Sequence, residues 1–295
     1  MQLDVKSRFD IWISGTKVEY KCFKFPAGEI GFKILNLNKI KETVMNYKNI
    51  IVDFVIRIQS SDDILMLMMA VDSIRIFLGK GNNCIYTLRM PYVPYSRQDR
   101  VCERGESFSL KVFCSLINSI NFDQVYISMP HSSVSTALLD CVHFNSIPEI
   151  MMNHAIGCFI KKHEMSAPVL VAPDAGCSKL VSNLNPGALE IIQAIKYRNP
   201  KDGSIMSSKI YGDVDGKDCI VVDDLCDGGA TFLSLAKSLR ENGAKRLLLV
   251  VYHGIFSKGF DELLEYYEVI WTTNSYRDFE LTEQYKDKVF IQNVF

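Results

Sequence analysis

The sequence predicts an α/β protein of two domains, each a mostly parallel sheet flanked by helices. Three observations predict this class. Short runs rich in β-branched and aromatic residues alternate with helical patterns, which is typical of β–α–β units around a parallel sheet. The 295 residues are enough for two medium domains. The alternation starts afresh near residue 145, so we expect domains over 1–145 and 146–295.

Charge, turn and capping signals mark where the strands and helices expected in the first domain begin and end. The segment 60–63, Ser-Ser-Asp-Asp, supplies a helix cap just before an apolar run, which predicts a helix over 64–78. A strongly apolar strand precedes this helix, and the strand after it runs into a loop rich in Pro, Tyr and charge. The expected strands are 10–14, 18–25, 50–58, 84–90 and 124–129, and the other expected helices are 108–120 and 132–139.

The second domain repeats this scheme. Gly243 is a usual stop for the helix expected over 231–242. A run over 189–197 leads into a polar segment, 199–209. The expected strands are 169–172, 219–222, 247–252, 268–273 and 289–294, and the other expected helix is 178–184. The sequence leaves open whether the last strand returns to the first domain.

Composition excludes several classes of protein. An apolar fraction of 48% and a charged fraction of 23% are typical of globular chains. A formal net charge of -1 argues against a general nucleic-acid or membrane-surface binder. The chain has no apolar run of membrane-spanning length, and its start lacks the apolar core of a signal peptide. Nine cysteines without a repeated Cys-x-x-Cys spacing indicate reduced thiols in a cytoplasmic protein without a zinc site.

The segment 219–231 combines a strand, two carboxylates and a glycine-containing turn that opens a helix. In open α/β sheets, ligands bind beyond the carboxyl ends of strands, where backbone N–H groups at a helix N-terminus favour phosphate. An Asp–Asp pair alone is more simply a solvated strand end, but the complete segment favours a site for a ribose phosphate or a metal. Its candidate binding residues are Asp223, Asp224, Asp227, Gly228, Gly229, Ala230 and Thr231.

This segment resembles the phosphoribosyl-pyrophosphate-binding motif that type I phosphoribosyltransferases share with ribose-phosphate diphosphokinases, the PRPP synthetases. A phosphoribosyltransferase consumes the pyrophosphate sugar, whereas a synthetase makes it. The segment 91–100 favours the synthetases, because it resembles their Pro-Tyr-x-x-Tyr-x-Arg-Gln-Asp signature. The resemblance implies ATP binding by Arg97, Gln98 and Asp99. It also implies two phosphoribosyltransferase-like domains, the first for ATP and oligomerisation and the second for ribose phosphate.

Two segments continue the resemblance with candidate magnesium contacts. The segment 171–176 resembles the Pro-Asp-x-Gly element of the synthetases, which implies a magnesium contact for Asp174. His131 falls where the family has Asp-Leu-His, which implies a role beside ATP and its metal. Met129 replaces the family's Asp there, so an additional metal contact at that position is not implied.

Two further segments imply catalytic and oligomer contacts. Lys196 and Arg198 match the Lys-x-Arg start of the family's mobile catalytic loop, and two cations there suit a charge-rich transition state. Phe25 and Glu29 match the ends of the family's Phe-Ser-Asp-Gly-Glu loop, which reaches the adenine site of a neighbouring subunit. The resemblance therefore implies a homo-oligomer built from dimers and often hexameric.

The implied reaction is attack by the C1 hydroxyl of ribose 5-phosphate on the β-phosphorus of ATP, with Mg²⁺ bound and AMP leaving. Gly228 replaces the first Thr of the usual phosphate loop, and Ala27 replaces an Asp of the adenine loop. Both departures leave open ADP-ribose as the acceptor, as in divergent relatives that rebuild NAD⁺. Family frequency favours ribose 5-phosphate. A phosphoribosyltransferase and a non-catalytic regulator of a synthetase are weaker alternatives, the latter because the candidate cations and metal residues are all present.

Overall fold

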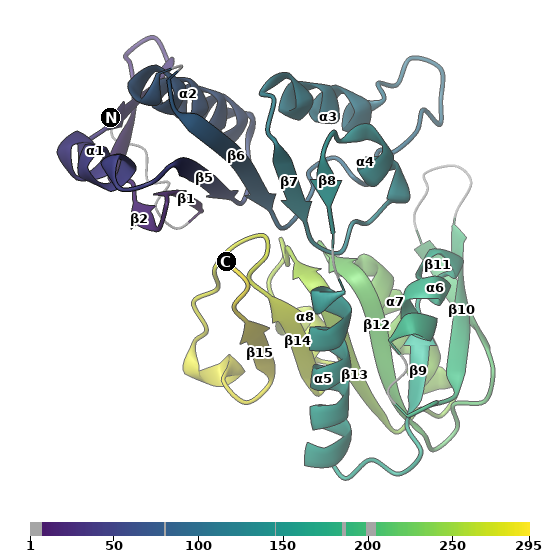
Figure 1. The fold of residues 1–295 in the computed structure, drawn as a ribbon. Coiled ribbons are helices and arrows are strands. Elements are labelled where there is room, and N and C mark those ends of the chain that lie inside the picture. Colours follow the sequence, from purple (N-terminus) through teal and green to yellow (C-terminus); the bar gives the residue numbers. More distant parts are fainter. Residues whose placement is uncertain (1–7, 80, 145, 185–186, 199–204) are drawn as a thin grey trace. The chain divides into compact units, whose positions relative to one another are not determined.

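The fold consists of two compact units, Met1–Phe144 with Phe295, and Asn145–Val294 (Figure 1). We describe a computed structural model that covers residues 8–79, 81–144, 146–184, 187–198 and 205–295. Each unit has its own sheet and its own cluster of buried apolar side chains.

The sheet of the first unit has the strand order β2-β1-β5-β6-β7-β8. The strands from β5 to β8 pair in parallel, and β1 pairs antiparallel with β2 and β5. A separate antiparallel hairpin consists of β3 and β4. The bounds are β1 Phe9–Ile13, β2 Thr16–Lys17, β3 Tyr20–Lys24, β4 Ile30–Ile34, β5 Asn49–Ile56, β6 Asn83–Met90, β7 Gln124–Ile127 and β8 Val142–His143.

The longest helix of this unit begins at a cap that the sequence predicts. The hydroxyl of Ser60 and the carboxylate of Asp63 form a capping box at the start of α2 (Ser61–Leu78). Asp63 is 1% exposed and also accepts a hydrogen bond from Arg8 at 2.9 Å. The other helices are α1 Leu37–Met45, α3 Ser109–Ser119 and α4 Ser133–Leu138. Among the described residues, no helix combines the length and the apolar character needed to cross a membrane.

The sheet of the second unit has the strand order β11-β10-β9-β12-β13-β14-β15. Every pair is parallel except β10 with β11. The bounds are β9 Val169–Ala172, β10 Ile191–Arg198, β11 Ile205–Tyr211, β12 Asp218–Cys226, β13 Arg246–Gly254, β14 Val269–Thr273 and β15 Val289–Gln292. The last strand thus pairs with β14 in this unit, and only Phe295 groups with the first unit.

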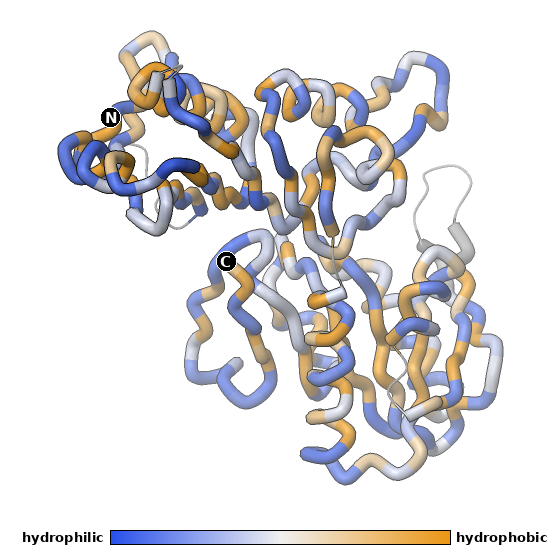
Figure 2. The backbone as a smooth tube through the Cα atoms, viewed as in Figure 1, coloured by the Kyte–Doolittle hydropathy of each residue, from blue (hydrophilic) through white to orange (hydrophobic). Residues whose placement is uncertain are grey.

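Helices cover both faces of this second sheet. Figure 1 shows α5 (Ile147–Lys162) in front of β13 and α7 (Ala230–Glu241) behind the strands. Every residue of β12 is buried, as expected for a central parallel strand. In Figure 2 the central strands are largely hydrophobic, and the hydrophilic colour gathers on surface loops. The remaining helical segments are η1 Ala175–Cys177, α6 Ser178–Asn183, α8 Asp261–Leu264 and η2 Glu283–Tyr285.

The structure differs from the sequence-based expectation in several elements. The strands β2, β4 and β8 and the helices α1, α5 and α8 are absent from the predicted set. The strand β11 occupies 205–211, much of which we predicted as a polar segment, because it pairs antiparallel with β10. Strand β12 also continues past Val222 to Cys226, because β13 runs beside it as far as Gly254.

One ion pair joins the starts of β12 and β13. Arg246 donates from Nε to Asp218 Oδ1 at 2.7 Å and from Nη2 to Asp218 Oδ2 at 2.6 Å. The side chain of Asp218 is 4% exposed, and the hydrogen bonds from Arg246 hold its pKa below the ordinary value of 3.8. This two-point contact fixes two neighbouring strands whose opposite ends carry the candidate site.

We expect Asp218→Asn to lower the free energy of unfolding by about 2–3 kcal/mol at neutral pH, because it breaks a largely buried, charge-assisted pair. Since the folded pKa of Asp218 is lowered, this contribution is present above pH 4 or so and is lost as pH falls through the folded pKa. Denaturant unfolding at several pH values measures the difference. Glu190→Gln, which removes the exposed partner of Lys217, is the control and should change stability little. Equal effects of the two variants would contradict this role for Asp218.

Candidate active site

The candidate site of the second unit lies at the carboxyl ends of β9 and β12. Val171 pairs with Val221. Asp174 lies in the turn two residues after the end of β9, and Asp224 lies in β12 three residues after Val221. Asp223 and Asp224 lie within β12 itself and are 7% and 8% exposed. The parallel pairing therefore brings together the acidic residues that the sequence predicts for this site.

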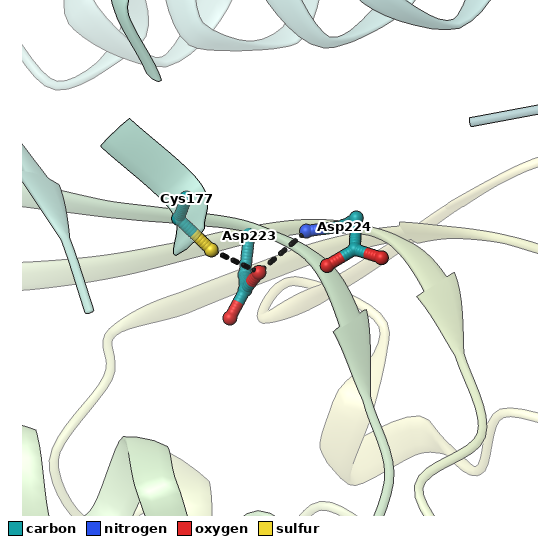
Figure 3. A group of neighbouring side chains, drawn as sticks. All are labelled: Cys177, Asp223 and Asp224. Atoms are coloured by element: carbon teal, nitrogen blue, oxygen red, sulfur yellow. Dashed lines mark hydrogen bonds between the residues drawn. The ribbon is translucent and has the colours of Figure 1, made fainter. Parts of the chain in front are cut away.

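A thiol that the sequence analysis did not select completes this cluster. Cys177 donates from Sγ to Asp223 Oδ1 at 2.6 Å, and the backbone N–H of Asp224 donates to the same oxygen at 2.8 Å (Figure 3). Cys177 ends the short η1 turn, whose cap is Asp174: the Asp174 side chain accepts from the Cys177 N–H at 3.1 Å. No local sequence signal marks Cys177 for this contact, because its partner lies 46 residues away in the sequence.

Burial dominates the electrostatics of this cluster. Burial, followed by the neighbouring Asp224 carboxylate, raises the pKa of Asp223 well above 3.8. Burial and the nearby Asp223 carboxylate also raise the pKa of the Cys177 thiol far above its ordinary value of 9.0. One ligand atom each from Cys177, Asp223 and Asp224 lie within 4.8 Å of one another. The protonated thiol is a donor to the carboxylate, so the oxygens are the atoms suited to sugar hydroxyls or a hard cation.

The turn 227–231 joins β12 to α7 and has the features of a phosphate-binding loop. Gly229 has a φ of 76°, which favours glycine, and precedes the first residue of α7, Ala230. A Cβ at Gly229 would lie 3.3 Å from Leu263 Cδ2, whereas the nearest atom to a Cβ at Gly228 is Ser257 Oγ at 3.7 Å. The helix N-terminus beside the partly buried Asp227 and Thr231 therefore presents backbone N–H groups where an anion can approach.

A second group of candidate residues lies in the first unit. Ser132 donates from Oγ to Asp99 Oδ2 at 2.7 Å and caps α4, next to His131. The hydrogen bond from Ser132, with that from Arg100, holds the pKa of Asp99 below its ordinary value of 3.8. The structure thus joins the segment of Arg97, Gln98 and Asp99 to the segment of His131. Arg97, Gln98 and His131 are exposed, as residues that bind a ligand can be.

Phe25 and Glu29 close the turn of the β3–β4 hairpin. The Phe25 N–H donates to the Glu29 carbonyl at 2.8 Å, and the Phe25 ring meets that of Phe23 edge-on with centroids 5.1 Å apart. Phe25 is 48% exposed. The turn therefore presents an aromatic ring on the surface of this hairpin.

Lys196 and Arg198 belong to the end of β10. Lys196 pairs with Ser208 and Arg198 pairs with Ile205, with an irregularity between Tyr197 and Arg198. The backbone of both residues thus pairs antiparallel with β11 up to the end of β10. The two side chains lie outside what the structure describes, so their predicted contacts stay predictions.

The fold defines the class: an α/β protein with two phosphoribosyltransferase-like domains. Its fold is similar to that of the phosphoribosylpyrophosphate synthetase from Mycobacterium smegmatis, with a TM-score of 0.72 and 20% identity over 94% of this chain and 86% of that one. Residues 182–284 match the family model of the phosphoribosyl synthetase-associated domain.

Two curated relatives share sequence with this chain. The ribose-phosphate pyrophosphokinase of Pasteurella multocida is 30% identical over 67% of this chain, and that of Ureaplasma parvum is 28% identical over 67%. The matches span 61% and 58% of the relatives' own lengths, less than two thirds. The chain is thus similar in sequence to ribose-phosphate pyrophosphokinases over part of their length.

The raised pKa of Asp223 predicts that Asp223→Asn stabilises the fold at neutral pH. Because the folded protein holds this proton more tightly than the unfolded chain, wild-type stability falls as pH rises from 3.8 toward the raised folded pKa. The slope is at most about 1.4 kcal/mol per pH unit for one proton. The stability gain of Asp223→Asn should therefore grow with pH when unfolding is followed in metal-free buffer.

The exposed Asp213 offers a matched control, since Asp213→Asn changes the same formal charge at a solvated position. Its effect on unfolding should be small and nearly independent of pH. A gain for Asp223→Asn that stays constant across the pH range would contradict the buried-carboxylate explanation.

Proposed function

We propose that this chain transfers the pyrophosphoryl group of ATP to the C1 hydroxyl of ribose 5-phosphate, giving phosphoribosyl pyrophosphate and AMP. The observation that carries the proposal is the buried Asp223–Asp224 pair directly ahead of the 227–231 turn at the start of α7. The names of the curated relatives, ribose-phosphate pyrophosphokinases, support the same reaction.

In this proposal the second unit holds the acceptor. The carboxylates of Asp223 and Asp224 accept hydrogen bonds from the ribose hydroxyls, and their burial strengthens those bonds. The backbone N–H groups of 227–231 and the N-terminal end of α7 bind the 5′-phosphate. The hydroxyl of Thr231 is an additional donor within the first helical turn. The C1 hydroxyl is thereby oriented for attack, which lowers the entropic part of the barrier.

The first unit holds ATP in this proposal. Arg97 supplies a forked donor to phosphate, and Gln98 supplies a matched donor and acceptor. Asp99 keeps its charge because Ser132 and Arg100 donate to it, and so holds the His131 segment in place. Phe25 and Glu29 contact the adenine bound by a neighbouring subunit, and the half-exposed Phe25 ring supports this role. The functional protein is then a homodimer or homohexamer.

The cofactor in this proposal is Mg²⁺, and the donor atoms present fit it. Asp174, Asp223 and Asp224 offer carboxylate oxygens, the ligands that Mg²⁺ prefers, near the carboxyl ends of two adjacent strands. The Cys177 thiol keeps its proton and points to Asp223, so it does not impose a soft-metal site. We assign Asp174 to the metal or its waters, with His131 on the ATP side. When bound, Mg²⁺ neutralises charge on the phosphate oxygens.

Lys196 and Arg198 are the catalytic cations in this proposal. The transferred group gains charge on its oxygens in the transition state, and two cations from one strand end can stabilise that charge. Their place on β10, which pairs with β9, supports a location close to Asp174 in the fold.

The thiols support a reducing compartment. All nine cysteines are free, and Cys22, Cys114, Cys219 and Cys226 are buried among apolar neighbours. Free thiols throughout a chain are typical of cytoplasmic proteins. We propose the cytoplasm as the location of the reaction.

The decisive test incubates the purified protein with ATP, Mg²⁺ and one acceptor, and follows AMP. We expect AMP with ribose 5-phosphate, at a 1:1 ratio to phosphoribosyl pyrophosphate, because attack at the β-phosphorus releases AMP rather than ADP. AMP with ADP-ribose alone would replace the proposed acceptor. Absence of AMP with both acceptors would overturn the proposed function, and base-dependent pyrophosphate release without ATP would indicate a phosphoribosyltransferase.

We expect Lys196→Ala to lower kcat by about 100-fold or more, since a lost donor to transition-state charge has that magnitude in other enzymes. The KM for ATP should change less, and the thermal unfolding midpoint should be unchanged. Lys209→Ala, on the paired strand β11, is the matched control and should keep full turnover. Turnover that survives in Lys196→Ala would remove this residue from the mechanism.

A further inference from the structure

A buried thiol contacts the acidic pair of the site. Cys177 is 8% exposed, and its Sγ lies 2.6 Å from Oδ1 of Asp223, a carboxylate that is itself 7% exposed. Strand β12 supplies Asp223, whereas the thiol comes from the turn after β9. The contact therefore ties together two segments 46 residues apart in sequence.

The backbone N–H of Cys177 forms hydrogen bonds that fix the position of this residue. The N–H of Cys177 donates to Asp174 Oδ1 at 3.1 Å and to the Asp174 carbonyl at 3.3 Å. These bonds close the η1 turn and fix the direction of the Cys177 side chain. A continuous series of contacts thus runs from Asp174 through Cys177 to Asp223.

The thiol restricts what Asp223 can do. Its Oδ1 accepts from two donors, the Cys177 thiol and the Asp224 N–H, and Figure 3 shows its second oxygen turned away from the thiol. Two donors on one oxygen select one rotamer of the carboxylate. Without the S–H donor, the Asp223 side chain would lose one of its hydrogen bonds and gain rotational freedom that binding must then remove.

We propose that Cys177 is a positioning residue that holds the Asp223 carboxylate in the orientation that accepts the hydroxyl groups of the ribose phosphate. This inference rests on the proposed function, because it assumes that the sugar binds at Asp223. The surroundings disfavour a nucleophilic role, since a thiolate would lie beside two buried carboxylates.

Replacements at position 177 distinguish two roles of the Cys177 side chain, as a hydrogen-bond donor and as a group that only fills space. Cys177→Ser keeps a donor of similar size, whereas Cys177→Ala and Cys177→Val lack one, and the Val side chain keeps the volume filled. Cys219→Ala is the control: Cys219 is fully buried in β12 and packs in the apolar cluster of the same unit. It should lower the thermal midpoint without changing the affinity for sugar.

The test measures the Kd of ribose 5-phosphate by calorimetry with Mg²⁺ present, together with the ATP Kd and AMP release. We expect Cys177→Ala and Cys177→Val to weaken ribose 5-phosphate binding by about five- to tenfold, which is the usual effect of losing one ordinary hydrogen bond. Cys177→Ser should stay within about threefold of wild type, and the ATP Kd should be unchanged in all variants. The two donor-lacking variants keep the test valid if one of them fails to fold.

The outcomes separate this inference from the proposed function. Equal ribose 5-phosphate affinity in wild type and the donor-lacking variants, or a Ser variant as weak as the Ala variant, would overturn the positioning role. Wild-type protein that binds ribose 5-phosphate but releases no AMP would overturn the proposed function alone. Wild-type protein that binds no ribose 5-phosphate would overturn both.

Discussion

The site depends on the parallel pairing of β9 with β12. In a parallel pair, equivalent ends of both strands reach the same edge of the sheet, and the pairing of Val171 with Val221 brings the turn after β9 to the edge where Asp223 and Asp224 lie. A slip of one residue would turn every side chain of the strand to the other face. The all-buried β12 resists such a slip, because both of its faces pack against apolar neighbours. The same strand register therefore determines both the stability of the sheet and the geometry of the acidic cluster.

In this arrangement, the burial of Asp223 and Asp224 makes the charged form of their carboxylates energetically unfavourable. Two adjacent carboxylates in a strand without exposed residues lie where a dry interior disfavours ionisation, and Asp223 responds with a raised pKa. A ligand that brings donors or positive charge relieves the conflict. The unliganded fold is thus less stable at this edge than an apolar strand would be, which is a common property of binding sites.

The sequence was sufficient for the class of fold and for the residues of the acidic cluster, because strand pattern, Gly229 and the Asp–Asp pair are local signals. It was insufficient for elements whose structure depends on contact with a neighbouring strand or with a segment distant in the sequence. Strand β11 is rich in Ser and Lys and becomes a strand only by pairing with β10. Helix α5 buries Met152, Ile156 and Phe159 along one stripe, but exposed isoleucines at 147 and 150 blur its period. The role of Cys177 depends on a turn that folds back on β12, a contact over 46 residues that no local pattern contains.

The two glycines of the 227–231 turn differ in how freely they can change. Gly229 combines a left-handed backbone with a close neighbour, Leu263, so any side chain there meets both conformational and steric penalties. At Gly228 the nearest atoms allow ordinary contact, and its neighbour is the exposed loop of Ser257 and Lys258. Position 228 can therefore accept a side chain while the backbone at position 229 stays constant. In the proposed function, position 229 fixes the backbone that holds the phosphate, and position 228 is free to vary with the group that the phosphate carries.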